Sequence, residues 1–507
     1  MQGGISGTKE ALGALADGKG ALLWAQRIAD CDTPISAALS LMRPERGDWI
    51  LESVEGGATR GRYSLIGLDP DLVLRAEGDA AQINRHWQLD RQRFKPLDQA
   101  PIDALRQLVG ECRIDPVPDG LPSALACLVG YFAYEIYGQI ETLPRPAPNP
   151  IGASDYFFVR PTLLLVFDRL TDLVWIVAPV WPDGAAPPER VVARAEERIN
   201  AALYALDQRG VSPCADMAID PTTMALEPVL PAGRYAQMVA RAKEYIVAGD
   251  IFQVVLAQRF TTPFTLPPIT LYRALRRINP SPFLYFLDLP EMAIVGSSPE
   301  ILVRVRDGEI TIRPIAGTRP RGANAAEDVA NRTSLLADAK ECAEHLMLLD
   351  LGRNDVGRSA RAGTVSVTDA FTVEFYSHVM HIVSNVVGAL DAGKDALDAL
   401  FAGFPAGTVS GAPKVRAAQI IAELESETRG VYAGGIGYFA PDGSMDSCIV
   451  LRTGILKDGM LHVTAGAGIV ADSDAEYEQR ECEAKARALL AAAQEAVRIA
   501  GEAGYGQ

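Results

Sequence analysis

Short apolar runs bounded by glycine, proline and aspartate dominate the first 180 residues of the chain. Such runs are typical of β-strands, and they predict strands at 49–54, 63–68, 72–76, 157–167 and 173–180. The last two flank Asp168-Arg-Leu-Thr-Asp, a candidate hairpin turn. From residue 182 the pattern predicts a helix that ends near Leu206, followed by a polar segment with scattered prolines. We therefore predict a strand-rich N-terminal lobe over 1–181 and a linker helix and crossover over 182–231.

The second half of the chain alternates between helices and groups of strands. Tyr235, Met238, Val239, Ala242 and Ile246 repeat with helical spacing. Strands are predicted near 251–260, 283–289, 292–306, 309–315, 378–388, 434–440, 446–456 and 461–467, and long helices near 325–350, 411–426 and 474–500. Because the strands come in adjacent groups rather than in strict βαβ alternation, the pattern favours an antiparallel α+β fold. We take 232–507 as the catalytic region.

Length and charge exclude several classes of function. A chain of 507 residues exceeds the roughly 250–300 residues at which a single core stops growing, so several cores or one very large sandwich are expected. The net charge of −16 repels phosphate backbones and anionic lipid. No run reaches the roughly 18 apolar residues of a membrane helix, and the first thirty residues resemble neither a signal nor a transit peptide. We predict a cytoplasmic protein with no nucleic-acid or membrane partner.

Three patterns imitate familiar binding sites. Gly466-Ala-Gly-Ile-Val-Ala matches a dinucleotide fingerprint, but too few residues follow it for a second βαβ half. The glycine-rich stretch 407–414 lacks the Gly-Lys-Ser/Thr ending of a phosphate loop, and Pro413 removes a backbone donor, so it suits a carboxylate better. His378 and His381 face opposite sides of a strand, so at most one of them can serve a given site.

Two acidic helices carry the clearest chemical signal. Glu341 and Glu344 share one helix face, and Glu478, Glu481 and Lys485 share a face of another. The ordinary explanation of such charges is a solvated helix surface. Carboxylates that face one another would instead suit Mg²⁺, which prefers oxygen ligands. Spacing alone leaves open whether the two helices meet.

A series of motifs in order adds a family resemblance between about residues 235 and 490. They are Gly249-Asp-Ile-Phe-Gln-Val-Val-Leu, Asn279-Pro-Ser-Pro, Gly296-Ser-Ser-Pro-Glu, Arg313-Pro-Ile-Ala-Gly-Thr, Glu344-His-Leu-Met-Leu-Leu-Asp-Leu-Gly-Arg-Asn-Asp, His378-Val-Met-His-Ile-Val-Ser, Phe404-Pro-Ala-Gly-Thr-Val-Ser-Gly-Ala-Pro-Lys, Gly435-Ile-Gly-Tyr and Ala465-Gly-Ala-Gly-Ile-Val-Ala-Asp-Ser. With these motifs the chain resembles the chorismate-utilising enzymes, most closely the large (aminase) component of anthranilate synthase. The resemblance implies a large sandwich of antiparallel β-sheets flanked by helices, with the active site in the cleft between the sheets.

The resemblance also implies a reaction, in which chorismate and ammonia give anthranilate and pyruvate with Mg²⁺. Glu344 and Glu481 match the metal ligands of the family, and Glu341 and Glu478 match positions that support the metal through water. Glu300 matches an acid beside the departing C4 hydroxyl, which must be protonated to act, so we expect a raised pKa. His381 matches a histidine that handles or orients a proton in the elimination. Substrate contacts are implied for Gly317, Thr318, Thr408, Tyr438, Arg452, Gly466, Ala467, Gly468 and Lys485.

Two positions discriminate between sister activities of the family. Relatives that make aminodeoxychorismate carry a nucleophilic lysine at the position of Ala316, which cannot form that covalent intermediate. Relatives that add water carry a lysine base at the position of Gln253, and a neutral amide cannot deprotonate water. The nucleophile should therefore arrive as ammonia. No glutamine-hydrolysing motif is present, so the resemblance implies a separate glutamine amidotransferase subunit.

The N-terminal lobe implies regulation. Leu51-Glu-Ser resembles the tryptophan-binding segment of the family, which a second segment completes in space. The residues implied are Leu51, Glu52, Ser53, Asn279, Pro282, Phe283, Leu284 and Tyr285. We therefore expect feedback inhibition by L-tryptophan. Taken alone, without the resemblance, the same residues favour an ordinary buried strand and a proline-rich turn.

Three alternatives remain open at this point. The first is an enzyme of the same fold that stops at 2-amino-2-deoxyisochorismate and eliminates no pyruvate. The second is the aminodeoxychorismate synthase component, which Ala316 disfavours. The third is a non-catalytic scaffold, against which the combined presence of five residues argues: Glu300, Glu344, His381, Glu481 and Lys485.

Overall fold

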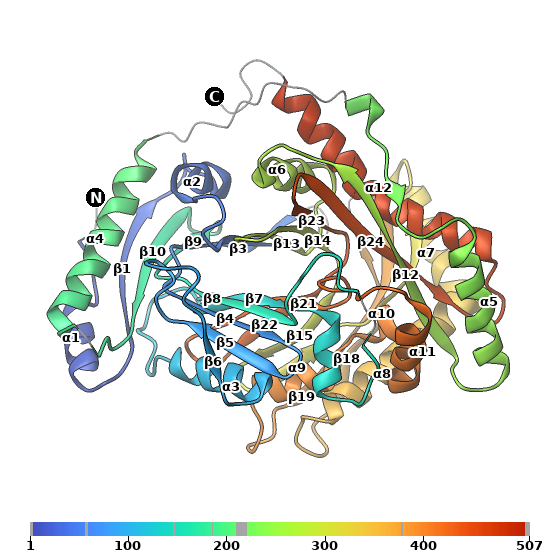
Figure 1. The fold of residues 1–507 in the computed structure, drawn as a ribbon, viewed down its shortest axis with the longest axis horizontal. Coiled ribbons are helices and arrows are strands. Elements are labelled where there is room, and N and C mark those ends of the chain that lie inside the picture. Colours follow the sequence, from blue (N-terminus) through green and yellow to red (C-terminus); the bar gives the residue numbers. More distant parts are fainter. Residues whose placement is uncertain are drawn as a thin grey trace.

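Two large antiparallel sheets lie one above the other, and helices cover their outer sides and ends (Figure 1). The computed structural model describes residues 4–55, 59–145, 148–184, 186–208, 221–376 and 379–501. The α+β sandwich expected from the sequence is confirmed, and every strand pairing in both sheets is antiparallel.

The first sheet has twelve strands drawn from both halves of the chain. In spatial order they are β1 (Ala21–Ile28), β10 (Leu173–Val180), β9 (Leu163–Asp168), β3 (Thr59–Leu68), β2 (Asp48–Glu55), β13 (Phe283–Asp288), β14 (Ala293–Ser298), β23 (Thr453–Lys457), β24 (Met460–Ile469), β12 (Gln253–Pro263) and β11 (Glu227–Pro228). The short strand β20 (Gly411–Ala412) also pairs with β12.

The second sheet also has twelve strands. Their order is β17 (Ile315–Pro320), β19 (Val379–Ala389), β16 (Glu309–Ile312), β15 (Ile301–Arg306), β22 (Met445–Ile449), β21 (Gly435–Phe439), β7 (Leu128–Phe132), β8 (Tyr156–Arg160), β4 (Leu72–Glu77), β5 (Ala80–Asn84) and β6 (Lys95–Leu97). Strand β18 (Ser366–Phe375) pairs with β19 beside this path. Strands from 1–181 and from 232–507 therefore share both sheets, while the boundaries at 181 and 231 stay predictions.

The helices pack mainly on the outer faces of the two sheets. They are α1 (Thr8–Ala16), α2 (Pro34–Leu41), α3 (Pro101–Glu111), α4 (Pro188–Leu206), α5 (Arg234–Val247), α6 (Pro268–Ile278), α7 (Ala325–Ala337), α8 (Ala339–Gly357), α9 (Ala396–Gly403), α10 (Gly407–Ser410), α11 (Lys414–Leu424) and α12 (Ala475–Ala500). Helix α12 lies on β24, and α8 lies on β17 and β19. The single helix predicted over 325–350 is two helices, because the Asp338 carboxylate caps the backbone N–H groups of Lys340 and Glu341 and starts α8.

The chain crosses between the sheets inside three segments that the sequence predicted as single strands. Residues 157–167 form β8 and β9, residues 292–306 form β14 and β15, and residues 446–456 form β22 and β23, each pair in different sheets. Pro161 and Pro299 stand at two of these crossings, where the missing backbone N–H interrupts the ladder. At the third crossing Arg452 has a left-handed backbone with φ 49°. Glu300 and Arg452 consequently lie where the chain passes between the two sheets.

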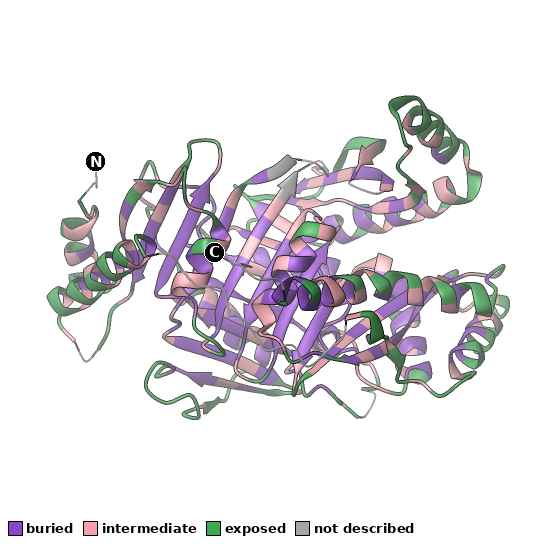
Figure 2. Cartoon of the chain, turned by 90° about the horizontal axis from the view of Figure 1, so that it is seen from above, coloured by how far each residue is buried: buried purple, intermediate pink, exposed green. Residues whose placement is uncertain are grey.

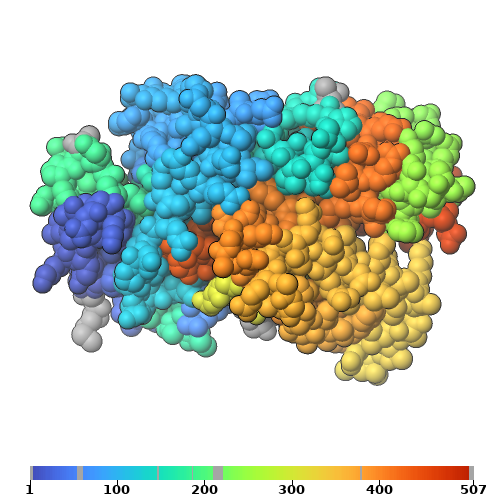
Figure 3. Space-filling model, turned by 90° about the horizontal axis from the view of Figure 1, so that it is seen from below, coloured from blue at the N-terminus to red at the C-terminus, as the bar shows by residue number. Residues whose placement is uncertain are grey.

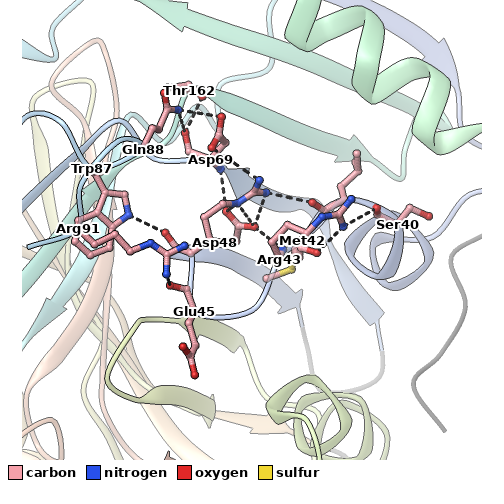
Figure 4. A network of polar contacts seen from close by, with 12 residues as sticks. Ser40, Met42, Arg43, Glu45, Asp48, Asp69, Trp87, Gln88, Arg91 and Thr162 are labelled. Carbon is pink, nitrogen blue, oxygen red and sulfur yellow. Dashed lines mark hydrogen bonds and ion pairs between the residues drawn. The ribbon is translucent and has the colours of Figure 1, made fainter.

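A buried carboxylate fixes the start of β2, the strand that carries Leu51-Glu-Ser. Asp48 is fully buried and accepts hydrogen bonds from the backbone N–H groups of Arg43 at 2.9 Å and Asp69 at 2.8 Å. The Arg46 guanidinium pairs with it at 2.7 Å. Figure 4 shows how this network joins the end of α2 to the strands beside it. The position of β2 in the sheet is therefore fixed from its first residue.

Burial concentrates in the two sheets, as the purple strands in the centre of Figure 2 show. The space-filling view from below places segments near residue 100 against segments near residue 400 (Figure 3). An ion pair between Arg106 and Asp398 at 3.1 Å crosses this boundary. Within the described ranges, the helices include none that is long and apolar enough to cross a membrane.

Candidate active site

Glu300 lies at a crossing between the sheets with its carboxyl group buried. The residue is 5% exposed, and its Oε1 accepts a hydrogen bond of 2.8 Å from the hydroxyl of Thr408 in α10. Burial disfavours the ionised form and raises the pKa of this carboxyl to about 8, although the bond from Thr408 opposes the shift. At neutral pH the group is therefore a protonated acid, as the sequence analysis expected.

His381 on β19 has one ring nitrogen committed to the backbone. Its Nδ1 lies 2.9 Å from the carbonyl oxygen of Gly317 and 3.1 Å from the hydroxyl of Thr318. Because a carbonyl can only accept, the imidazole hydrogen is on Nδ1, and the Nε2 lone pair can accept a proton. Burial lowers the pKa of this imidazole and keeps it neutral. His378, the other histidine considered, lies outside the described residues.

The backbone around Gly317 explains why its carbonyl reaches the histidine. The pairing of β17 with β19 is irregular between Ala316 and Thr318, and Gly317 has φ 67°. A bulge of this kind bends the strand and turns a peptide group out of the ladder. The glycine thereby orients His381 through its own carbonyl.

Arg452 supplies a cation to the same region. Burial lowers the pKa of its guanidinium, and the ring of Tyr376 is close enough to favour the charged form. Over the part of the chain that the structure describes, no carboxylate forms an ion pair with this guanidinium. A half-buried arginine without an acidic partner is suited to a carboxylate of a bound molecule.

The charges of the acidic helices α8 and α12 lie close enough to influence one another. The pKa of Glu344 is raised by burial and then by repulsion from Glu341 on its own helix and Glu481 on α12. Glu478 is buried, and its pKa is raised by burial and by Glu481. Lys485 pairs with Glu481 at 2.6 Å, and Arg319 pairs with Glu341 at 3.1 Å.

These carboxylates suit a hard divalent cation. Oxygen donors that repel one another become favourable partners once such a cation lies between them. Among the described residues, no three acidic, histidine or cysteine side chains already converge as a complete ligand set. The donor chemistry therefore fits Mg²⁺, and the predicted roles of Glu341, Glu344, Glu478 and Glu481 stay predictions.

Strand β24 passes close to these helices. Lys485 donates a hydrogen bond of 2.9 Å to the carbonyl oxygen of Gly466. A Cβ atom on Gly468 would lie 2.5 Å from the amide nitrogen of Gln253, whose side chain hydrogen bonds to Glu344. Ala467 points the other way and packs in the hydrophobic core. The structure thus brings Gly466, Gly468 and Gln253 together with the acidic helices.

Tyr432 belongs to this region, although the sequence analysis missed it. A Cβ atom on Gly466 would lie 2.9 Å from the Tyr432 hydroxyl, and the tyrosine is 6% exposed. The sequence instead singled out Tyr438, six positions further on. The local sequence does not distinguish the two tyrosines, because Tyr432 precedes a glycine-rich strand and Tyr438 lies within the same strand.

A second region, a cavity of about 820 Å³, lies between the two sheets. Among its lining residues are Leu51, Glu52, Ser53, Pro282, Phe283, Leu284, Tyr285 and Tyr438. Strand β2 pairs directly with β13, with Ser53 opposite Phe283 and Leu51 opposite Tyr285. The two segments predicted for tryptophan are therefore neighbouring strands, and Asn279 lies at the end of α6 ahead of them. The structure also places Tyr438 in this cavity.

The carboxylate of Glu52 is fully engaged by protein groups. It accepts hydrogen bonds from the Tyr272 hydroxyl at 2.8 Å, the Ser64 hydroxyl at 3.0 Å and the guanidinium groups of Arg169 and Arg276. Burial opposes ionisation, but the bonds and charges of Arg276, Tyr272 and Arg169 hold the pKa below its ordinary value. The side chain therefore stabilises the wall of the cavity.

Comparison with known proteins adds a family to this geometry. Residues 53–491 match the family model described as chorismate binding enzyme. The anthranilate synthase component 1 of Cereibacter sphaeroides is 50% identical over 494 residues, which cover 96% of this chain and 97% of that protein. The anthranilate synthase component 1 of Pseudomonas aeruginosa is 44% identical over 470 residues, covering 92% and 94%.

A solved structure agrees with this result. The crystal structure of anthranilate synthase component I from Streptococcus pneumoniae has a TM-score of 0.73 and 35% sequence identity, and covers 92% of this chain and 99% of that one. The chain is thus an enzyme of the chorismate-utilising class, and the non-catalytic scaffold is excluded. It belongs to the chorismate-binding enzymes, and within that family to the anthranilate synthase component 1 proteins.

Proposed function

We propose that this enzyme acts in the cytoplasm and converts chorismate and ammonia to anthranilate, pyruvate and water, with Mg²⁺ bound. The observation that carries the proposal is Glu300, a buried carboxyl whose pKa of about 8 keeps it protonated between the sheets. Departure of a hydroxyl as water needs such an acid. The anthranilate synthase component 1 proteins at 50% and 44% identity support the same reaction.

The two steps balance with proton transfers at the site. Ammonia adds at ring carbon C2 while the C4 hydroxyl leaves as water with the proton of Glu300, and the new ammonium group returns a proton to the Glu300 carboxylate. Loss of the C2 proton to a base then expels the enolpyruvyl group as an enolate, which takes up that proton to become pyruvate, and the ring becomes aromatic. Nε2 of the neutral His381 is available to accept a proton in this second step. Arg452 would hold a substrate carboxylate, since it is half-buried and has no acidic partner in the described chain.

Glu344 and Glu481 would hold Mg²⁺ directly, with Glu341 and Glu478 supporting it through water. When bound, the ion would supply a Lewis acid to a substrate carboxylate. The mutual repulsion that raises the pKa of Glu344 supports this assignment. Removal of the ion with a chelator should abolish turnover, and added Mg²⁺ should restore it.

Two residues favour ammonia over other nucleophiles. Ala316 is 8% exposed and carries no nucleophilic atom, which disfavours an enzyme-bound intermediate. Gln253 is a neutral amide, so its side chain cannot deprotonate a water molecule as a lysine base at this position would. The ammonia would come from a separate glutamine amidotransferase subunit, and the chain alone should use ammonium salts but not glutamine.

The cavity between the sheets would bind L-tryptophan as a feedback inhibitor. Its volume of about 820 Å³ can hold an indole and the polar end of an amino acid. Ser53 lies on its wall, so Ser53→Phe should fill part of it and reduce inhibition. A Ser53→Phe variant inhibited as readily as the parent would contradict this assignment.

One assay tests the reaction and separates the remaining alternatives. The purified chain is mixed with chorismate, Mg²⁺ and an ammonium salt at mildly alkaline pH, and products are followed by fluorescence and chromatography. Fluorescent anthranilate with equimolar pyruvate supports the proposal. Accumulation of 2-amino-2-deoxyisochorismate without pyruvate, or of aminodeoxychorismate, would overturn it.

A further inference from the structure

The cavity predicted for tryptophan and the site around His381 have a wall in common. On the second sheet the cavity is lined by Arg313, by Glu374 and Phe375 at the end of β18, and by Tyr376. On the first sheet it is lined by the strand that carries Ser53. A molecule in the cavity would therefore contact β2 on one side and the end of β18 on the other.

Tyr376 reaches from this wall to the catalytic histidine. Its ring packs edge-on against the His381 imidazole, with 5.4 Å between the ring centroids and 63° between the planes. Its backbone is held as well, since its N–H donates to the carbonyl oxygen of Val379 at 2.8 Å and its carbonyl oxygen accepts from Arg321 at 2.7 Å. The backbone of Tyr376 is therefore anchored, and its ring supports one edge of His381.

The hydroxyl of Tyr376 is tied to the charged part of the same wall. It donates to Oε2 of Glu374 at 3.0 Å, and Oε1 of Glu374 accepts from Arg313 at 2.5 Å. Arg313 and Glu374 are each partly exposed, with side-chain exposures of 40% and 31%. A ligand can reach the Arg313–Glu374 pair from the cavity. Any movement of this pair also moves the Glu374 carboxylate, to which the Tyr376 hydroxyl is bonded.

The charges of the two regions also influence one another. The charge of Glu374 raises the pKa of His381, and that of Arg452 lowers it. Tyr376 in turn lies close enough to Arg452 and Glu300 to affect both. Displacement of Glu374 or Tyr376 would therefore alter the orientation and the proton affinity of His381 together.

We propose that Tyr376 is a positioning residue that couples occupancy of the cavity to the catalytic histidine, through the chain Arg313, Glu374, Tyr376 and His381. The inference rests on the proposed function, in which tryptophan binds in this cavity. An effector couples to a second site only when it interacts differently with two arrangements of the protein. In the first arrangement the Tyr376 hydroxyl is bonded to Glu374 and its ring supports His381. In the second, a ligand in the cavity contacts the Arg313–Glu374 ion pair and displaces the Tyr376 ring.

The test separates binding of tryptophan from its effect on turnover. Tyr376→Phe keeps a ring against His381 but removes the bond to Glu374. Calorimetry measures the tryptophan Kd, and the ammonium-dependent assay measures the tryptophan concentration for half-inhibition, in the parent and the variant. We expect the ratio of half-inhibition concentration to Kd to rise at least tenfold in Tyr376→Phe. A ratio equal to that of the parent would overturn the inference.

Two further variants keep the result interpretable. Tyr63→Phe removes a hydroxyl from the same cavity on the opposite sheet and should change Kd and half-inhibition by the same factor. Glu374→Gln keeps an acceptor for Tyr376 but weakens the pair with Arg313, and should also raise the ratio. Thermal unfolding of each variant shows that it is folded.

A second measurement requires no turnover. Coupling of binding energies is reciprocal, so chorismate without ammonium should weaken tryptophan binding to the parent, and should do so less in Tyr376→Phe. Tryptophan that neither binds nor inhibits the parent would overturn the regulatory part of the proposed function and the inference with it. Tryptophan that binds and inhibits parent and variants alike would overturn the inference alone.

Discussion

Two buried glutamates in this enzyme show opposite chemistry. Glu52, beside the cavity between the sheets, is 4% exposed, and Glu300, at the proposed active site, is 5% exposed. Burial lowers the stability of the ionised form of both. The pKa of Glu52 is nevertheless held below its ordinary value, whereas that of Glu300 is raised to about 8.

The difference comes from the partners of each carboxylate. Two arginines, a tyrosine and a serine donate to Glu52, so its charge is balanced and hydrogen bonded. Glu300 has the hydroxyl of Thr408 as its side-chain donor and no cation bonded to it among the described residues. Equal burial therefore produces a structural anion in one region and a proton donor in the other.

The sharpest test of the comparison removes the acid. Glu300→Gln keeps the shape of the side chain but supplies no proton, so kcat should fall by about 10²–10⁴-fold. The free energy of unfolding at neutral pH should not fall, since the unfolded glutamate is ionised and must take up a proton on folding, whereas glutamine is neutral in both states. Turnover with ammonium and urea unfolding at neutral pH measure the two effects.

Glu135 provides a matched control for this variant. Burial raises the pKa of Glu135 to about 7, and its carboxylate accepts bonds from the backbone N–H groups of Arg429 and Gly430. Glu135→Gln should leave kcat within a few-fold of the parent. If both glutamine variants lost turnover equally, the special role of Glu300 would be wrong.

The opposite behaviour is expected at Glu52. Glu52→Gln leaves Arg169 and Arg276 without their buried counter-charge, which should lower the free energy of unfolding by about 3–5 kcal/mol. Ser64→Ala removes a neutral donor from the same carboxylate and should cost about 1 kcal/mol. Urea unfolding compares the two variants, and equal losses would contradict a structural anion at Glu52.

The sequence predicted the strands and their antiparallel class but not where the chain changes sheets. The apolar runs 157–167 and 292–306 continue through their crossings, so the pattern alone resembles one long strand. Pro161 and Pro299 were the only local signs of a crossing, and a proline marks a change of sheet only when a second sheet is there to receive the chain. The position of Glu300 and its raised pKa were therefore expected from the family motif, while its burial and its bond to Thr408 became visible only in the packed structure.

The site residues divide in the same way. Motif order assigned His381 and Arg452, but the bulge at Gly317 that orients the histidine is a property of strand pairing. Tyr432 was missed because its contact with Gly466 joins segments far apart in the chain. Local sequence patterns predict which positions are buried and which secondary structure they form. Contacts between segments far apart in the chain decide which buried polar groups meet.

The two glutamates should also give stability opposite dependences on pH. The unfolded chain loses the Glu300 proton near the ordinary value and the folded chain loses it near 8, so stability falls as pH rises between about pH 5 and 8. The lowered pKa of Glu52 instead contributes stability that is lost as pH falls below the ordinary range. Neither slope can exceed about 1.4 kcal/mol per pH unit.

Urea unfolding at a series of pH values separates these contributions. Between about pH 5 and 8 the parent should lose stability relative to Glu300→Gln. Below that range the parent should approach Glu52→Gln. A constant difference between the parent and Glu300→Gln across the upper range would show that Glu300 has an ordinary pKa.

The smallest expected effect concerns the hydroxyl that bonds to the acid. Because Thr408 donates to Glu300, it favours the ionised form and lowers the pKa. Thr408→Val should therefore move the alkaline limb of the kcat profile to higher pH, by up to about one unit. Rates are compared at equal concentrations of free ammonia, since the ammonium equilibrium changes over the same range.

Thr318→Val is the matched control for that shift. The Thr318 hydroxyl lies beside Nδ1 of His381 rather than beside Glu300, so its removal should change kcat without moving the alkaline limb. If the alkaline limb moves to lower pH in Thr408→Val, or moves equally in both variants, the limb reports the titration of a group other than Glu300. A shift confined to Thr408→Val would show that the difference between Glu300 and Glu52 depends on the donors around each carboxylate, as their equal burial requires.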